Sequence, residues 1–152
     1  MLAAGCLLLA AISDVRAFKI SNVYPACLVL LFLGSRVVWG FSGDDWQHLL
    51  HFAVALAVGM LLFKIGWVGG GDAKLYAASA LWFSGLNAAL LIFATGMAGL
   101  LLAIFYVVRR KTSRKVDRSK RSERRIPYGV AIAGGAIIMG VFVGVERLIP
   151  LA

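Results

Sequence analysis

The sequence has few cysteines and no internal repeat, and both facts narrow its class. Its 152 residues include two cysteines, Cys6 and Cys27, which form no C-x-x-C pair. A structural zinc or a redox centre is therefore unsupported, and we expect both cysteines to be plain buried residues. The stretch from Leu2 to Cys6 resembles a lipoprotein cleavage box. However, neither a charged start nor an apolar region precedes it, so we do not expect a signal peptide.

Acidic residues are also scarce, with seven Asp and Glu against 16 Lys and Arg. Two of the acids, Asp14 and Asp72, lie within or beside long apolar stretches. A charged side chain at the bilayer centre costs about 2.5–3.5 kcal/mol on insertion scales, so such residues usually have a partner or a function. These two carboxylates are the first candidates for a functional site.

Apolar residues are abundant. They make up 61% of the chain, and the mean hydropathy is +0.88. A water-soluble domain of this length could not bury so much apolar surface, which indicates an integral membrane protein. Membrane-spanning helices need about 20 apolar residues. The predicted fold is therefore all-α, a single-domain polytopic membrane bundle of about six transmembrane helices over residues 1–152, with spans near 1–18, 23–40, 46–65, 73–83, 86–108 and 128–149.

Three glycines, Gly69 to Gly71, come directly before the short fourth span. Successive glycines lose the most backbone entropy on ordering, so this stretch predicts irregular backbone that reaches into a protected cleft. We expect Asp72 to cap a helix that begins at Ala73, because Asp is a preferred cap residue.

Basic residues orient the bundle, since Lys and Arg collect on the cytoplasmic side. In the six-span arrangement 14 of the 16 basic residues fall on one side, ten of them between Arg109 and Arg125. Arg36 and Arg147 fall on the other side. Both termini should then face outward, with the basic loop inside.

This topology places Asp14 and Asp72 on the same, cytoplasmic side. Asp14 ends the first span and Asp72 follows the third, so two crossings return the chain to one face. A simpler alternative makes them two interfacial acids, with Asp14 paired to Arg16 or Lys19 and Asp72 serving as a cap.

Four segments together resemble the type IV prepilin leader peptidases, which are membrane aspartic proteases with a G-x-G-D motif. The resemblance is closest to the short peptidases of Flp-type, or tight-adherence, pilus systems and covers essentially the whole chain. The residues that carry it are Asp14 with Arg16, Ile20-Ser21-Asn22, Gly69-Gly70-Gly71-Asp72-Ala73-Lys74-Leu75 and Ile126-Pro127-Tyr128-Gly129. One departure is Ser21, where the family often has proline.

The resemblance implies that Asp14 and Asp72 are the catalytic pair. They would remove the leader peptide of a prepilin at the cytoplasmic face of the bacterial inner membrane, ahead of the pilin's apolar segment. Larger members carry a cysteine-containing cytoplasmic domain and also methylate the new N-terminus. This chain has no room for that domain, so we expect peptidase activity alone and no cofactor.

Two neighbouring carboxylates suit this chemistry, because an ionised Asp can activate water while a protonated Asp supplies the acid. Two such groups in one site cannot both ionise cheaply, so they share a proton. We hypothesise that Asp72, near a helix N-terminus, is the ionised member, and that Asp14, towards a helix C-terminus, holds the proton.

Other motif residues have positional roles in this interpretation. Gly69, Gly70 and Gly71 would let an extended substrate or the helix of Asp14 approach closely. Lys74 either extends to the cytoplasmic surface or tunes Asp72. Pro127 and Tyr128 start the last helix and pack near the site. Asn22 belongs to the motif that precedes the second span.

Two further patterns have competing interpretations. His48 and His51 have a spacing that could hold a metal, but they fall on the side away from the carboxylate pair, so we expect no metal. The basic loop at 109–125 could suggest nucleic acid. Its position between two spans favours contact with anionic lipid instead.

Two other functional classes remain open for the whole chain. A proton-coupled transporter also uses intramembrane aspartates, although it usually has more spans or repeated halves. A noncatalytic scaffold of a pilus or secretion system would not require both acids. Replacing each aspartate by Asn distinguishes these classes from an enzyme.

Overall fold

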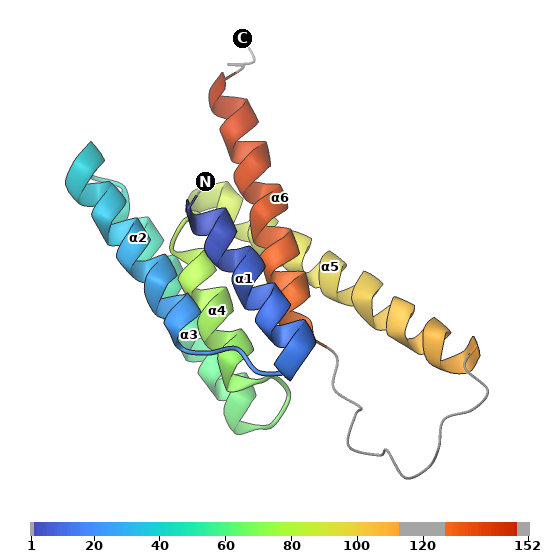
Figure 1. Ribbon diagram of the computed structural model, residues 1–152. Coiled ribbons are helices and arrows are strands. Elements are labelled where there is room, and N and C mark those ends of the chain that lie inside the picture. Colours follow the sequence, from blue (N-terminus) through green and yellow to red (C-terminus); the bar gives the residue numbers. More distant parts are fainter. Residues whose placement is uncertain (1, 113–126, 149–152) are drawn as a thin grey trace.

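The chain folds into helices in every part that the computed structural model describes, residues 2–112 and 127–148. Side chains are described for 2–109 and 127–144. The described parts contain six helices and no strand, which confirms the predicted all-α class (Figure 1). The helices are α1 (Leu2–Ala17), α2 (Val23–Trp39), α3 (Asp45–Lys64), α4 (Gly70–Ala80), α5 (Gly85–Thr112) and α6 (Tyr128–Leu148).

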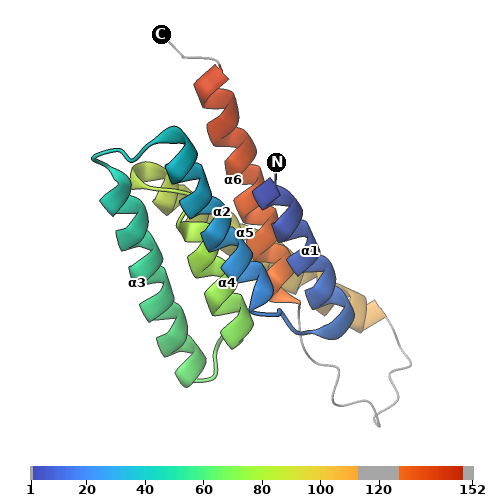
Figure 2. The same ribbon diagram turned by 60° about the vertical axis from the view of Figure 1, so that its left-hand side comes forward.

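Helix α4 is the buried centre of the bundle. It packs against α3, α2 and α6, and Figures 1 and 2 show it among these neighbours. Its 11 residues extend only about 16 Å, against a hydrocarbon core of about 30 Å, so α4 by itself spans about half of that core. Small side chains let α3 approach it, because a Cβ added at Gly59 would stand 3.0 Å from the Cβ of Ala73. The buried residues of α4 are Ala73, Leu75, Ala77, Ala78, Ser79 and Ala80.

Helix α5 has most of its contacts with α6 and leans away from the rest of the bundle (Figure 1). The two helices meet closely at Gly135, where an added Cβ would lie 2.8 Å from the backbone nitrogen of Thr95. Helix α1 packs on the other side of α6 and against α2. Helix α6 therefore joins α5 to the bundle.

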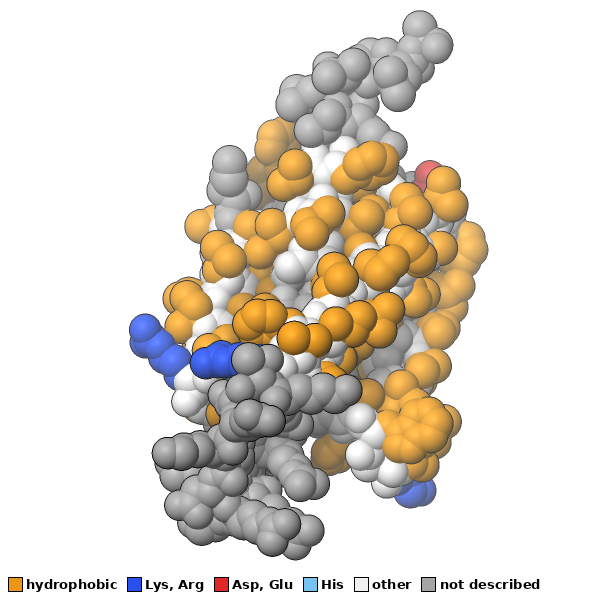
Figure 3. Space-filling model, turned by 90° about the vertical axis from the view of Figure 1, so that its right-hand side faces the viewer, with side chains coloured by type: hydrophobic (Ala, Val, Ile, Leu, Met, Phe, Trp, Pro, Cys, Tyr) orange, Lys and Arg blue, Asp and Glu red, His pale blue; other side chains and the backbone are white. Residues whose placement is uncertain are grey.

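The outer surface is apolar, as expected for a protein surrounded by lipid. Two helices, Asp45–Lys64 and Gly85–Arg109, are long and apolar enough to cross a membrane, and 23–39 and 128–144 are shorter apolar helices. Hydrophobic side chains cover most of the face in Figure 3, and Lys and Arg gather toward one end of it. Large apolar residues are widely exposed, including Val37, Val38 and Trp39. This distribution is the reverse of that in a soluble domain.

Three local predictions are wrong. Gly70 and Gly71 are helical, and the N-cap is Gly69 rather than Asp72. Tertiary packing overrides the glycine propensity, because Phe63 covers Gly70 and Ile20 covers Gly71. The turn before α4 instead uses Gly66, whose φ is +79°. Of the two cysteines expected to be buried, Cys6 is half-buried and Cys27 is exposed on the apolar surface.

Candidate active site

Asp14 lies in the last turn of α1 but serves another helix. Its side chain is 5% exposed, and its Oδ2 accepts a hydrogen bond of 2.7 Å from the backbone N–H of Gly129. The first N–H groups of a helix have no partner within that helix, so Asp14 caps the N-terminus of α6. The alternative pairing of Asp14 with Arg16 or Lys19 does not occur, since the only salt bridge among the described side chains joins Arg36 to Asp45.

Asp72 is the third residue of α4, and its carboxylate folds back toward the start of the same helix. Its side chain reaches the backbone N–H of Gly69, as an acid in the third helical position commonly does. A Cβ added at Gly69 would stand 2.6 Å from Oδ2. The other oxygen, Oδ1, is buried and has no hydrogen-bond partner among the residues that the structure describes. One carboxylate oxygen is therefore left over after capping.

Ile20 connects the two carboxylate-bearing regions. A Cβ added at Gly71 would lie 3.0 Å from the Cβ of Ile20, and one added at Gly129 would lie 2.7 Å from its Cδ1. The buried Ile20 side chain thus touches the N-termini of both α4 and α6. Asp14 and Asp72 consequently lie at the same end of the bundle, close enough to interact electrostatically.

Further motif residues connect helices around this end of the bundle. The Lys74 Nζ donates a 3.2 Å hydrogen bond to Oδ1 of Asn22, which ties α4 to the turn before α2. Pro127 is buried directly before α6. Tyr128 packs against α5, because a Cβ added at Gly99 would stand 2.5 Å from its hydroxyl. These residues position helices in the structure.

Sequence reasoning missed two residues of the site. Gly129 supplies the N–H that Asp14 accepts, and it needs to lack a side chain because an added Cβ would lie 2.8 Å from Asp14 Oδ2. Its position in the Pro-Tyr-Gly segment was the available signal. Ile20 was part of a quoted motif, but only the folded arrangement shows that it bridges two helices.

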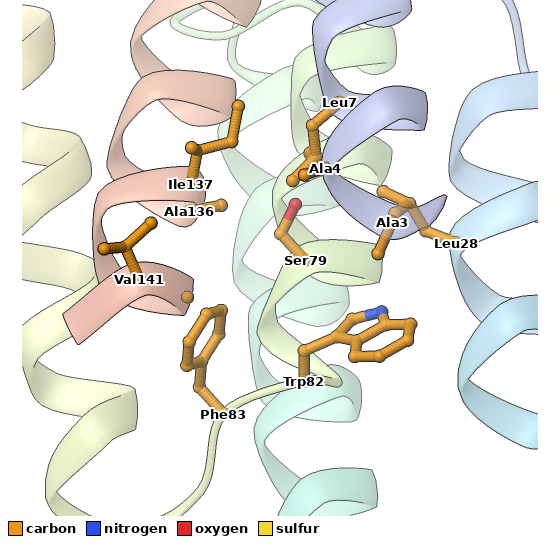
Figure 4. Close-up of a pocket in the computed structure, with 11 residues that line it drawn as sticks. Ala3, Ala4, Leu7, Leu28, Ser79, Trp82, Phe83, Ala136, Ile137 and Val141 are labelled. Atoms are coloured by element: carbon orange, nitrogen blue, oxygen red, sulfur yellow. The ribbon is translucent and has the colours of Figure 1, made fainter. Parts of the chain in front are cut away.

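A cavity of about 390 Å³ opens beside Asp72, between α3, α4, α5 and α6. Its walls are mainly apolar and also include Tyr128. A second cavity, of about 380 Å³, lies among α1, α2, α4 and α6 (Figure 4). Trp82 and Phe83 flank this second cavity together with apolar side chains, and no carboxylate lines it. Of these two cavities among the described residues, the first adjoins the candidate site.

The two histidines are at the other end of α4. The Nδ1 atom of His48 lies 3.0 Å from the carbonyl oxygen of Leu81, and that of His51 lies 2.9 Å from the carbonyl oxygen of Phe83. The described residues contain no cluster of three or more His, Cys, Asp or Glu side chains able to hold a metal. The histidines instead serve carbonyl groups that follow the end of α4. Most of the basic loop at 109–125 lies outside the described residues.

The fold and the site define a helical membrane protein with two interacting carboxylates at helix N-termini. Comparison with protein families matches residues 1–104 to the Type IV leader peptidase family. The chain therefore belongs to the type IV leader peptidase family, whose members are classed as peptidases. No curated protein and no solved structure matches the chain significantly.

Proposed function

We propose that the protein is a membrane aspartic endopeptidase that removes the leader peptide from prepilin-like precursors, with Flp-type pilins as the expected substrates. The observation that carries the proposal is the Oδ1 atom of Asp72, which is buried and has no hydrogen-bond partner among the described residues. Helix capping accounts for the Gly129 contact of Asp14 and for one oxygen of Asp72. It does not account for the other oxygen, Oδ1, which is buried and makes no hydrogen bond among the described residues. A catalytic water bound between the two acids would account for it, because the water would donate a hydrogen bond to this oxygen.

The carboxylate pair would act by sharing one proton. The ionised member takes a proton from water as the water oxygen bonds to the scissile carbonyl carbon. The protonated member gives its proton to the intermediate as the carbon–nitrogen bond breaks. Asp14 as well as Asp72 lies at a helix N-terminus, so the helix-end argument that assigned the proton to Asp14 no longer separates them. The proton belongs to the pair.

The site would work at the cytoplasmic face of the bacterial inner membrane. The charge asymmetry supports this, with both termini outside and the basic loop inside, against anionic lipid rather than nucleic acid. Acidic residues expected on the inner side are few, namely Asp14, Asp72, Asp117 and Glu123. Recognition of a basic leader by charge is therefore limited, and the apolar segment after the leader must contribute to binding.

The decisive experiment is processing of a co-expressed prepilin by the parent protein and by the variants Asp14→Asn and Asp72→Asn. Asn keeps the shape and hydrogen bonding of the side chain but cannot transfer the proton. We expect each variant to lose cleavage by at least about 10²–10⁴-fold. Asp44→Asn is a matched control, because Asp44 is an exposed acid at the opposite end of the bundle.

Membrane levels of all variants should equal that of the parent. Cleavage retained by Asp14→Asn or Asp72→Asn would mean that this carboxylate is structural and that the dyad mechanism is wrong. A parent that cleaves no pilin-like precursor would contradict the proposed function and favour a transporter or a scaffold of the pilus or secretion apparatus.

A further inference from the structure

Three residues that line the same cavity each have a buried polar atom without a partner among the described residues. Among the described side chains, Asp72 Oδ1, His51 Nε2 and the Tyr76 hydroxyl are buried and make no hydrogen bond. All three residues line the 390 Å³ cavity beside the candidate site. Buried polar groups normally have hydrogen-bond partners, so three unsatisfied groups in one apolar cavity indicate that a ligand with polar groups enters it.

The cavity is elongated and runs along α4. Its lining residues on α3 extend from His51 to Leu62, a helical length of about 16 Å. Helix α3 packs chiefly on α4, and α5 packs chiefly on α6. Figure 1 shows α5 leaning away from the bundle toward the end where α4 begins. We call this space the α3–α5 groove.

The chemistry of the groove selects its occupant. The Nδ1 of His51 donates to the carbonyl oxygen of Phe83, so in the tautomer that makes this hydrogen bond Nε2 is an acceptor. Asp72 adds a carboxylate oxygen, and Tyr76 adds a hydroxyl that both donates and accepts. The remaining walls include Val54, Val58 and other apolar side chains. The occupant must therefore offer apolar side chains together with free N–H groups.

A regular transmembrane helix does not meet this requirement, because its backbone groups bond to one another. An extended peptide does, since its N–H and C=O groups are free and its side chains can face the apolar walls. At about 3.3 Å per residue, an extended chain of about five residues spans the groove. A peptidase also needs its substrate unwound at the bond it cleaves.

We propose that the α3–α5 groove binds the first few residues of the substrate's apolar segment in an unwound, extended form. The scissile peptide lies at Asp72, and the residues after it run along α4 toward Tyr76 and His51. This inference rests on the proposed function and adds to it a binding site for the part of the precursor that remains after cleavage.

Gly96 allows the groove to be filled without disturbing the fold. It lies on α5 in the groove wall, and a Cβ added there would meet no atom within 4 Å. Gly96→Leu should reduce processing of a full-length pilin-like precursor by about 10²-fold, the cost of misplacing a substrate by about 1 Å. The matched control is Gly140→Leu, which fills the second cavity from an equally open position. It should stay within about twofold of the parent.

A crosslinking measurement gives an independent readout that does not depend on cleavage. A photo-reactive residue at Val58, in the groove, should capture the first residues of the precursor's apolar segment in the inactive Asp72→Asn background. The same probe at Ile137, in the second cavity, should not. Crosslinking still tests the groove proposal if Gly96→Leu does not reach the membrane.

The outcomes separate the two proposals. Suppose that the parent cleaves, that Asp72→Asn is inert and that Gly96→Leu cleaves normally. The groove proposal is then wrong, and the proposed peptidase function is retained. Crosslinks of equal strength from Val58 and Ile137, or none from Val58, also overturn the groove. A parent that cleaves no precursor overturns the proposed function and the groove together.

Discussion

At the scale of single residues, the site depends on a glycine as much as on its two acids. Asp14 reaches a helix that follows it by more than a hundred residues, through one hydrogen bond to Gly129. The contact is possible because residue 129 has only a hydrogen atom where other residues carry a Cβ. A side chain at 129 would occupy the space of the Asp14 carboxylate.

Gly129→Ala should therefore disable the proposed enzyme. The added methyl group would lie 2.8 Å from Asp14 Oδ2 and 2.7 Å from Ile20 Cδ1, so the carboxylate must move. We expect precursor cleavage to fall by about 10²-fold. Gly134→Ala on the same helix is the control, because a Cβ there meets nothing within 4 Å. Cleavage that Gly129→Ala leaves at the parental level would show that the hydrogen bond to Asp14 has no part in catalysis.

At the scale of elements, helix boundaries were largely predictable and the exact site geometry was not. Apolar runs indicate helices with ends correct to within a few residues, because a membrane protein's spans are continuous. The start of α4 was missed, since glycine propensity argues against a helix at Gly70 and only packing against Phe63 and Ile20 makes one. The topology predicted from the charge asymmetry placed Asp14 and Asp72 on the same side of the membrane. The cap that Asp14 makes on α6 could not be predicted, because it depends on how distant helices pack.

The contact between α5 and α6 gives a test of this packing. At Gly135 an added Cβ would lie 2.7 Å from Thr95 Cγ2 and 2.8 Å from the Thr95 backbone nitrogen, so the helices would have to separate. Small residues commonly allow such close approach between membrane helices. Gly135→Val should lower the free energy of unfolding by about 1–3 kcal/mol. Gly134→Val, one residue away in open space, controls for the change in helix propensity.

Thermal or denaturant unfolding of the two variants in the same detergent checks this prediction. Equal stability of Gly135→Val and Gly134→Val would mean that α5 and α6 do not meet at Thr95 in solution. The result bears on function as well, because α5 forms one wall of the α3–α5 groove and α6 carries Gly129.

At the scale of the whole molecule, apolar surface and charge together set the orientation in the membrane. Large hydrophobic side chains are exposed along the helices, and Lys and Arg gather toward one end (Figure 3). Asp14 and Asp72 lie toward the end where α1 stops and α4 begins. The positive-inside tendency supports the proposal that this end faces the cytoplasm, where precursors are made.

Cysteine labelling tests this orientation directly. Phe41, in the turn between α2 and α3, and Trp67, in the turn between α3 and α4, are both well exposed. With Cys6 and Cys27 replaced by Ala, a membrane-impermeant maleimide should label Phe41→Cys in intact cells and Trp67→Cys only after the cells are opened. Each variant serves as the other's control for reactivity in opened cells. The reverse pattern would place Asp14 and Asp72 outside, and a cytoplasmic leader peptidase would then be impossible because its precursors could not reach the acids.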